Sequence, residues 1–234
     1  MEKSNHQENY EKFMEQYQDY YVDYMNKNEV FDSFYAYGPL SEKYWTFKHR
    51  ILVCNLEPYD EREGVIKVDI DLYKEWIKAP TGIYTAKFIT GLIKALNQEN
   101  RDESISLNNV CNEELLSYME NIAYMNFRIS SGKNRTADKI GILKDVRTHP
   151  DYLIAQINSL YPDMLIIGGE VGLKAYNELF NTNLKFDTTV ILKGKVICSI
   201  QHPSKPRPEK YEYYNEKVIE ILNCLEVIQK TQEN

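Results

Sequence analysis

Apolar residues along this chain gather in short runs and in longer one-sided segments, separated by polar turns. The short runs are rich in Val, Ile and Leu, as in buried strands, and they predict strands at residues 50–55, 65–70, 121–127, 163–168, 188–193 and 195–199. The longer segments carry apolar residues on one side, as in amphipathic helices. They predict helices at residues 80–97, at a short stretch from Asn112, and at residues 151–161, 172–180 and 210–231.

This alternation of strands and helices predicts the fold class. Strands that alternate with helices form a parallel sheet whose two faces are covered by helices. We therefore predict an α/β protein, a three-layer α/β/α fold with a largely parallel central sheet. In such sheets the ligand lies beyond the carboxyl ends of the strands. Functional residues are accordingly expected in the loops that follow the strands.

The N-terminal part of the chain is rich in tyrosine. Aromatic and Met residues recur there at roughly helical spacing: Tyr10, Phe13, Met14, Tyr17, Tyr20, Tyr21, Tyr24 and Met25. The spacing predicts an amphipathic helix that packs on the core, although a tyrosine stripe also suits stacking on bases. We expect residues 1–45 to form a helical, Tyr-rich extension on an α/β domain of residues 46–234, as one domain overall.

Length and composition narrow the class of protein. The 234 residues fit one sizeable domain. No apolar run approaches the ~20 residues that span a bilayer, and the start of the sequence lacks the pattern of a signal peptide. We expect a cytoplasmic protein without membrane contact. The four cysteines are widely spaced, which provides no zinc or iron–sulfur motif, and Cys54 and Cys198 are predicted to be core residues.

The charge of the chain bears on nucleic-acid binding. A net charge of −7 counts against a high-affinity DNA scanner, because phosphate contacts supply most of the non-specific affinity. The basic residues nevertheless form two stretches, the first with Arg128, Lys133, Arg135, Lys139, Lys144 and Arg147, the second with Lys205, Arg207 and Lys210. Two basic loops on an acidic protein can still form one local phosphate-binding surface.

Three strand-exit loops carry the candidate chemistry. The first begins Asn55-Leu-Glu-Pro-Tyr and places a carboxylate, a proline and an aromatic ring after a buried strand. The second begins with Asn126 and Phe127; an Asn side chain both donates and accepts, which suits a base edge. Ser130, Lys133 and Arg135 follow and suit phosphate oxygens. Each of these two loops is also compatible with an ordinary polar turn.

The third loop reads His-Pro-Ser-Lys-Pro-Arg and begins at His202. Pro203 restricts the backbone next to His202, while Ser204, Lys205 and Arg207 suit contact with a phosphate. A single histidine is more often structural than catalytic. The position of this one at a strand exit, followed by a serine and two cations, favours function.

Taken in order, these motifs resemble those of the family-1 uracil-DNA glycosylases. That family carries Gly-Gln-Asp-Pro-Tyr-His, then Leu-Leu-Asn, then a strand ending in Trp-Gly, then His-Pro-Ser-Pro. This chain carries Asn-Leu-Glu-Pro-Tyr-Asp, then Tyr-Met-Asn-Phe, then Leu-Ile-Ile-Gly-Gly, then His-Pro-Ser-Lys. The order and the approximate intervals agree over residues 50–222.

The resemblance implies a role for each matching residue. Glu57 would position the attacking water and stabilise the cationic sugar. Pro58 would stiffen the loop and Tyr59 would exclude the methyl group of thymine. Asn126 would read the base and His202 would stabilise the departing base. Ser204 would contact the DNA phosphates.

Several positions depart from the family pattern. Glu57 is one methylene longer than the usual Asp, which shifts the carboxylate by about 1 Å and is expected to slow the reaction. Asp60 replaces a histidine, and Lys205 and Pro206 replace a proline and the leucine that enters the duplex. No tryptophan follows the fourth strand, where the chain has Gly169 and Glu170. The catalytic groups match, and the base-pocket wall and the duplex wedge differ.

The predicted function is monofunctional DNA glycosylase chemistry on a flipped-out uracil or a related damaged or modified pyrimidine. We expect single- or double-stranded DNA as the partner, a monomer, and no metal or organic cofactor. One alternative is a non-catalytic nucleic-acid-binding relative with the same fold. Another is a glycosylase for a different modified base, for example in phage DNA. An unrelated nucleotide enzyme would be expected to carry G-x-G-x-x-G or a P-loop, and the sequence has neither.

Overall fold

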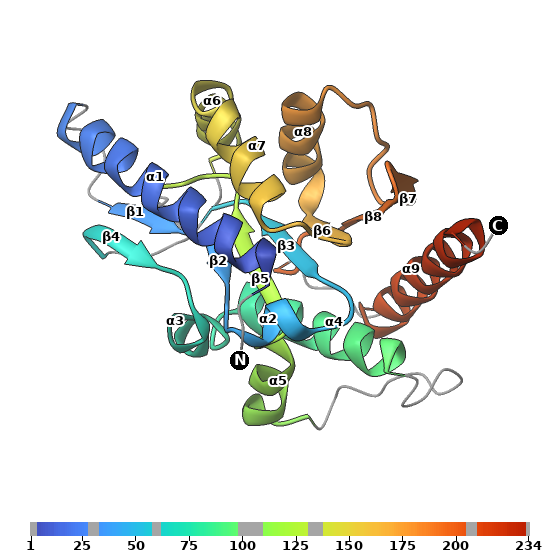
Figure 1. Ribbon diagram of the computed structural model, residues 1–234. Helices are drawn as coiled ribbons and strands as arrows, with labels where there is room; N and C mark the ends of the chain where they lie inside the picture. Colours follow the sequence, from blue (N-terminus) through green and yellow to red (C-terminus); the bar gives the residue numbers. More distant parts are fainter. Residues whose placement is uncertain are drawn as a thin grey trace.

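A six-stranded sheet forms the centre of the computed structural model, which describes residues 4–27, 33–57, 62–97, 110–130, 138–204 and 210–232 (Figure 1). The strand order is β2-β5-β3-β6-β8-β7. The strands are β2 (Gly38–Pro39), β5 (Ile122–Asn126), β3 (Ile51–Asn55), β6 (Met164–Gly168), β8 (Lys195–Ile200) and β7 (Thr189–Leu192). The four inner strands run parallel, and the edge strands β2 and β7 run antiparallel to their neighbours.

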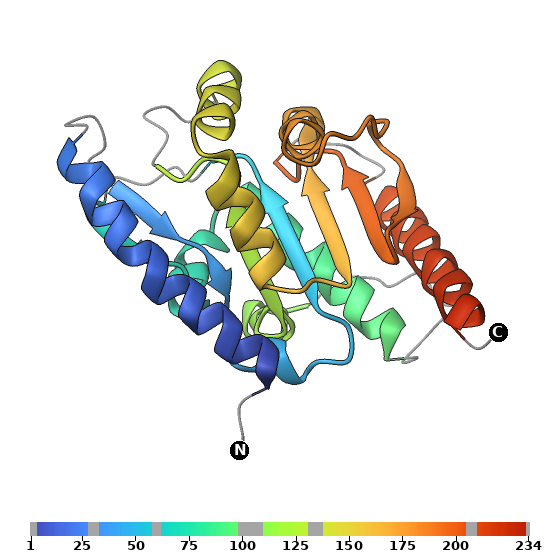
Figure 2. The ribbon, with the colours of Figure 1, turned by 45° about the horizontal axis from the view of Figure 1, so that its top comes forward.

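Helices cover both faces of this sheet, as Figure 2 shows. On one face, α4 (Pro80–Leu96) contacts α3 (Ile70–Trp76), α5 (Asn112–Met119) and α9 (Lys210–Gln232). On the other face, α7 (Pro150–Ser159) contacts α1 (Asn5–Lys27), α6 (Lys139–Thr148) and α8 (Gly169–Phe180). The predicted three-layer α/β/α fold with a mostly parallel sheet is therefore confirmed.

The core lies where the sequence pattern predicts it. All residues of β3, β5 and β6 are buried, because inner strands of a parallel sheet are covered on both faces. Cys54 and Cys198 are buried thiols inside this core, as predicted. Within the described part of the chain, no helix combines the length and the apolar character needed to cross a bilayer.

The N-terminal helix α1 packs on α7, which confirms the predicted amphipathic helix. Phe13 is 8% exposed and its ring lies 5.7 Å from that of Tyr152. The side chains of Tyr20, Tyr21, Tyr24 and Met25 lie outside the described residues. After the helix, β1 (Ser33–Ala36) pairs in parallel with β4 (Gly64–Lys67), and β2 joins the edge of the main sheet. The division at residue 45 stays a prediction.

Three short helices were not predicted as such. The strand expected at 65–70 ends at Lys67, and α3 begins at Ile70 because the Asp69 side chain caps the amides of Asp71 and Leu72. Helix α6 begins after Asp138, whose side chain accepts a hydrogen bond from the Gly141 amide. The third is the one-turn helix α2 (Lys43–Thr46), which follows shortly after Ser41.

Candidate functional site

The carboxyl ends of the parallel strands bring the described residues of all four predicted motifs to one edge of the sheet. Asn55 ends β3 and faces Asn126 at the end of β5. Gly168 ends β6, next to Asn55 and Pro203: a Cβ atom on Gly168 would lie 2.2 Å from Asn55 Oδ1 and 3.5 Å from Pro203 Cδ. A Cβ atom on Gly169 would lie 3.3 Å from His202 Cβ. The strand order changes direction at β3, where a ligand is expected in such folds.

Asn126 has a fixed orientation. Its side chain is buried and its Nδ2 donates to the Tyr37 hydroxyl over 3.0 Å. That hydroxyl donates its own proton to the Arg128 carbonyl over 3.3 Å, and burial raises the pKa of Tyr37 well above its ordinary value. Tyr37 therefore accepts from Asn126 and cannot donate to it. The amide oxygen of Asn126 is left as a buried acceptor with no hydrogen-bond partner among the described residues.

Asn55 shows the same arrangement on the neighbouring strand. It is 2% exposed, and its Nδ2 donates to the Tyr124 hydroxyl over 3.0 Å. Its amide oxygen faces the backbone of Gly168 and has no hydrogen-bond partner within the described chain. A buried acceptor without a partner costs about 1–3 kcal/mol, so two of them at one sheet edge indicate a site for a polar ligand.

Glu57 lies two residues beyond β3 and is already bound on both carboxylate oxygens. Oε2 accepts from Arg128 Nη1 over 2.7 Å, and Oε1 accepts from the Asp138 amide over 2.8 Å. The amide of Arg128 donates to the Leu56 carbonyl over 3.0 Å, so the β3–β5 ladder continues past the strand ends. This continued pairing places Arg128 beside Glu57.

Arg128 also contacts a second carboxylate. Its Nε lies 3.3 Å from Asp145 Oδ2 on α6 and donates to Ser130 Oγ over 3.2 Å. Burial raises the pKa of Asp145 above its ordinary value, and the Arg128 charge opposes that rise. The charge pattern of the sequence predicts that Arg128 belongs to a phosphate-binding surface. The structure instead directs its guanidinium at Glu57 and Asp145.

His202 lies two residues beyond β8, and its ring contacts Ser204. Its Nδ1 lies 2.8 Å from Ser204 Oγ and 3.4 Å from the Ser204 amide nitrogen. An amide can only donate, so Nδ1 is an acceptor and the ring proton of the neutral imidazole is on Nε2. Gly169, beside His202, has a φ of +82°, a left-handed conformation that glycine adopts without a steric cost. In this tautomer the imidazole N–H is at Nε2.

The remaining predicted site residues lie in different settings. Phe127 is fully buried and Ser130 is 3% exposed, whereas Ser204 is exposed. The predicted substrate contact by Phe127 and DNA contacts by Ser130 and Ser204 stay predictions. Six further candidates lie outside the described residues: Pro58, Tyr59, Lys133, Arg135, Lys205 and Arg207.

Substituting Gly168 tests how closely β6 approaches Asn55. Gly168→Ala should lower the free energy of unfolding by about 1–3 kcal/mol, because the methyl group forces the Asn55 amide away from Tyr124. The φ of Gly168 is −84°, so the backbone itself tolerates alanine. Urea unfolding should show that the cost of Gly168→Ala is smaller in an Asn55→Ala background, where the obstructing amide is missing. Equal costs in both backgrounds would contradict this contact.

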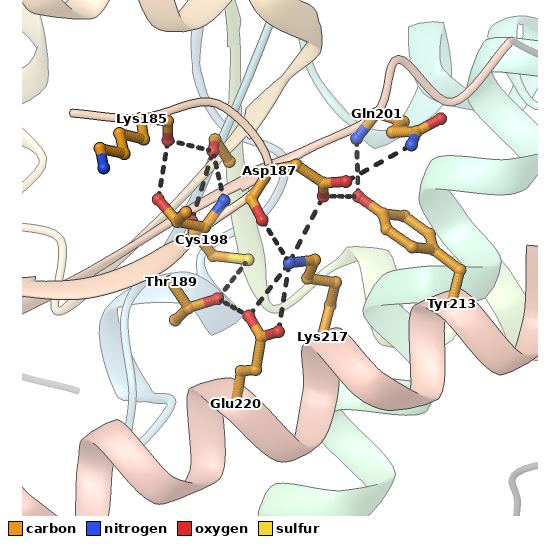
Figure 3. A network of polar contacts seen from close by, with 10 residues as sticks. Lys185, Asp187, Thr189, Cys198, Gln201, Tyr213, Lys217 and Glu220 are labelled. Carbon is orange, nitrogen blue, oxygen red and sulfur yellow. Dashed lines mark hydrogen bonds and ion pairs between the residues drawn. The ribbon is translucent and has the colours of Figure 1, made fainter.

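A polar network that the sequence pattern does not predict lies beside the end of β8 (Figure 3). Tyr213 on α9 donates to Asp187 Oδ1 over 2.6 Å, and Lys217 Nζ donates to the Asp187 carbonyl over 2.7 Å. Partial burial opposes ionisation of Asp187, but the Tyr213 hydrogen bond and the Lys217 charge together hold the pKa of Asp187 below its ordinary value. The network joins segments 26 and 30 positions apart, which no local pattern reveals.

The depressed pKa of Asp187 predicts a pH dependence of stability. A carboxyl group whose pKa is lower in the folded state stabilises the fold above its unfolded pKa of about 3.9, and loses that contribution as the pH falls through the folded pKa. Asp187→Asn lacks this titration. The stability difference between wild type and Asp187→Asn should therefore shrink below about pH 4, as urea midpoints at a series of pH values would reveal. A constant difference would contradict the prediction.

No known protein family matches this sequence, and no curated protein matches it. Among the described residues, no group of three or more His, Cys, Asp or Glu side chains is arranged to hold a metal ion.

Proposed function

We propose that this chain is a monofunctional DNA glycosylase that hydrolyses the N-glycosidic bond of a flipped-out uracil or a related pyrimidine. The observation that carries the proposal is the Asn126 side chain. It is buried at a strand end, and Tyr37 fixes its amide with the oxygen as acceptor. A uracil edge presents an N–H beside a carbonyl, and an Asn amide presents the complementary acceptor and donor. The ordered motif resemblance supports the same reading.

The chemistry requires two charges to be stabilised. When the bond between the sugar and the base breaks, the electron pair leaves with the base and positive charge develops on the sugar. The Nε2–H of His202 would donate to the anionic base, as an oxyanion-type donor does. The carboxylate of Glu57 would stabilise the sugar cation and orient the attacking water. Glu57 and His202 follow the parallel strands β3 and β8, whose carboxyl ends lie at one edge of the sheet, which supports this division of roles.

Base release provides the direct test of the proposal. Labelled single- and double-stranded oligonucleotides that contain uracil or modified pyrimidines would be incubated with the protein, and abasic sites would be detected by alkaline cleavage. Asn126→Ala should lower kcat/KM by about 10- to 100-fold, since the base loses its hydrogen bonds to a buried amide. Asn121→Ala is the matched control, because Asn121 precedes the other end of β5 and its amide donates to the nearby carbonyls of Ser117 and Tyr118. Equal losses would refute base reading by Asn126.

A non-catalytic DNA-binding relative is the second candidate, and one observation favours it. Both oxygens of Glu57 already accept a hydrogen bond from the protein, which leaves the carboxylate fewer positions for a water. Glu57→Gln separates the two functions. If the protein is an enzyme, Glu57→Gln abolishes base release and preserves DNA binding. If it only binds DNA, the wild type already releases no base, and Glu57→Gln leaves the affinity for DNA unchanged.

Contacts with DNA phosphates are proposed for Lys133, Arg135, Lys205 and Arg207. Charge reversal at these positions should weaken binding and flatten its dependence on salt. Lys193→Glu is a suitable control, because Lys193 is exposed in the β7–β8 turn, at the opposite end of β8 from His202. Similar salt slopes for the control and the test variants would remove the four residues from the interface.

A further inference from the structure

The residue that precedes His202 is held by a helix and not by a neighbouring strand. The β6–β8 ladder ends where Gly168 pairs with Ile200. The next amide, of Gln201, donates to the Tyr213 hydroxyl over 2.8 Å. That hydroxyl donates onward to Asp187 Oδ1 over 2.6 Å. The Tyr213 hydroxyl on α9 therefore binds the backbone amide one residue before His202, where a neighbouring strand would otherwise provide the acceptor (Figure 3).

Asp187 is itself held from several sides. Lys217 Nζ donates to its carbonyl over 2.7 Å and lies 3.4 Å from its Oδ1. The Lys217 side chain is 6% exposed, so this contact is largely removed from water. Asp187 has a φ of +64°, a left-handed conformation that Asp adopts more readily than most other non-glycine residues. Its contacts with Tyr213 and Lys217 hold it in this conformation.

The other end of the network is tied to the sheet and to a second helix. Lys217 Nζ also donates to Glu220, whose Oε2 accepts from the Thr189 hydroxyl over 2.6 Å on β7. The ring of Tyr214 lies 5.2 Å from that of Phe88 on α4. Helix α9 is thus anchored on both sides, and Tyr213 extends from a rigid support.

We infer that Tyr213 and Asp187 are positioning residues that fix the direction in which the chain leaves β8, and thereby the placement of the His202 imidazole. The inference rests on the proposed function for its catalytic consequence, and on the contacts alone for the placement of His202. A displacement of about 1 Å at a catalytic group lowers a rate by roughly 100-fold. The phenol that holds Gln201 is therefore expected to affect turnover without contacting the substrate.

The test is Tyr213→Phe, which removes only the hydroxyl group. The matched control is Tyr44→Phe, because the buried Tyr44 hydroxyl donates to the Leu160 carbonyl over 2.7 Å, close to the start of β6 and at the opposite end of the sheet. Tyr44→Phe loses one buried hydrogen bond and Tyr213→Phe loses two partly buried ones, so a general loss of stability affects both variants. The first readout is the imidazole Cε1–H resonance of His202 in the DNA-free protein, assigned with His202→Ala. The second is kcat and KM for base release.

We expect Tyr213→Phe to move the His202 resonance and to lower kcat by about 10- to 100-fold with little change in KM. Tyr44→Phe should do neither. Asp187→Gly, which suits the left-handed backbone and removes the carboxylate, should reproduce the Tyr213→Phe shift. Asp187→Asn retains an acceptor for Tyr213 and should therefore keep the His202 resonance and kcat close to their wild-type values.

The two proposals fail in distinguishable ways. An unchanged His202 resonance in Tyr213→Phe overturns the positioning role, whatever the activity. An unchanged kcat in an active enzyme overturns it as well. If the wild type releases no base while Tyr213→Phe still moves the resonance, positioning of His202 is supported and the glycosylase proposal fails.

Discussion

Replacing Arg128 by Met should lower the free energy of unfolding by about 3–5 kcal/mol. The guanidinium lies between two carboxylates, 2.7 Å from Glu57 Oε2 and 3.3 Å from Asp145 Oδ2. The Glu57 side chain is 5% exposed and that of Asp145 is 12% exposed. Without Arg128, water replaces little of the lost interaction, and two buried negative charges face each other without compensation.

Arg147→Met provides the matched control for this loss. Arg147 forms a two-point contact with Glu178, with distances of 2.8 and 2.7 Å, so its pairing geometry is at least as good. Its side chain is 64% exposed, however, and exposed ion pairs contribute about 0–1 kcal/mol. Urea unfolding at neutral pH should separate the two variants clearly. Equal losses would show that the Arg128 cluster contributes no more than a surface pair.

The stability deficit of Arg128→Met should also depend on pH. Burial already raises the pKa of Asp145, and Arg128 opposes the rise, so the pKa should rise further without it. A carboxyl group with a raised folded-state pKa takes up a proton more readily when folded, and its penalty grows as the pH increases from the unfolded-state pKa to the folded-state pKa. The deficit should therefore be smallest near the unfolded-state pKa of about 3.9 and grow as the pH rises toward the folded-state pKa. Asp145→Asn in the Arg128→Met background should recover part of it.

The sequence predicted the sheet and the loops at its edge, because those features depend on local patterns. Residues 51–54 and 164–168 are apolar, as strands covered on both faces require. Asn55 and Asn126 come directly after such runs, and His202 lies two residues beyond the end of β8. The rule that parallel strands end at one edge then suffices to bring them together.

The partners of these residues could not be predicted, because they are distant in sequence. Asn126 is oriented by Tyr37, 89 positions away, and Glu57 is bound by Arg128, 71 positions away. Tyr37 lies in the tyrosine-rich extension predicted over residues 1–45, and nothing in that pattern links it to Asn126. A residue type and its local neighbours do not reveal whether a phenol or a guanidinium is directed at one particular amide or carboxylate across the fold.

Short helices escaped prediction for a different reason. Helix α6 has ten residues, and its Ile140 is 82% exposed, so its apolar side is incomplete. Its start depends on the Asp138 cap, and the amide of the same residue also binds Glu57. The N-terminus of α6 thus helps to hold the candidate site. Its capping residue was the available signal, since Asp is common at helix starts.

Replacing His202 by Ala should have the largest effect on activity if the proposed function is correct. The Nε2–H of His202 would meet the negative charge that develops on the departing base, and the loss of one such preorganised donor lowers kcat by about 10²- to 10³-fold. KM should change little, because the donor acts on a charge that is present mainly in the transition state. Single-turnover base release from uracil-containing oligonucleotides measures the chemical step directly.

His49→Ala is the control that isolates this effect. His49 is partly buried and lies just before β3, at the opposite end of the parallel strands, so its loss removes an imidazole without touching the candidate site. Its activity should stay within about twofold of the wild type, a margin well below the effect of a lost donor. If His202→Ala and His49→Ala release base at similar rates, His202 does not stabilise the departing base. The stabilising donor must then come from another group.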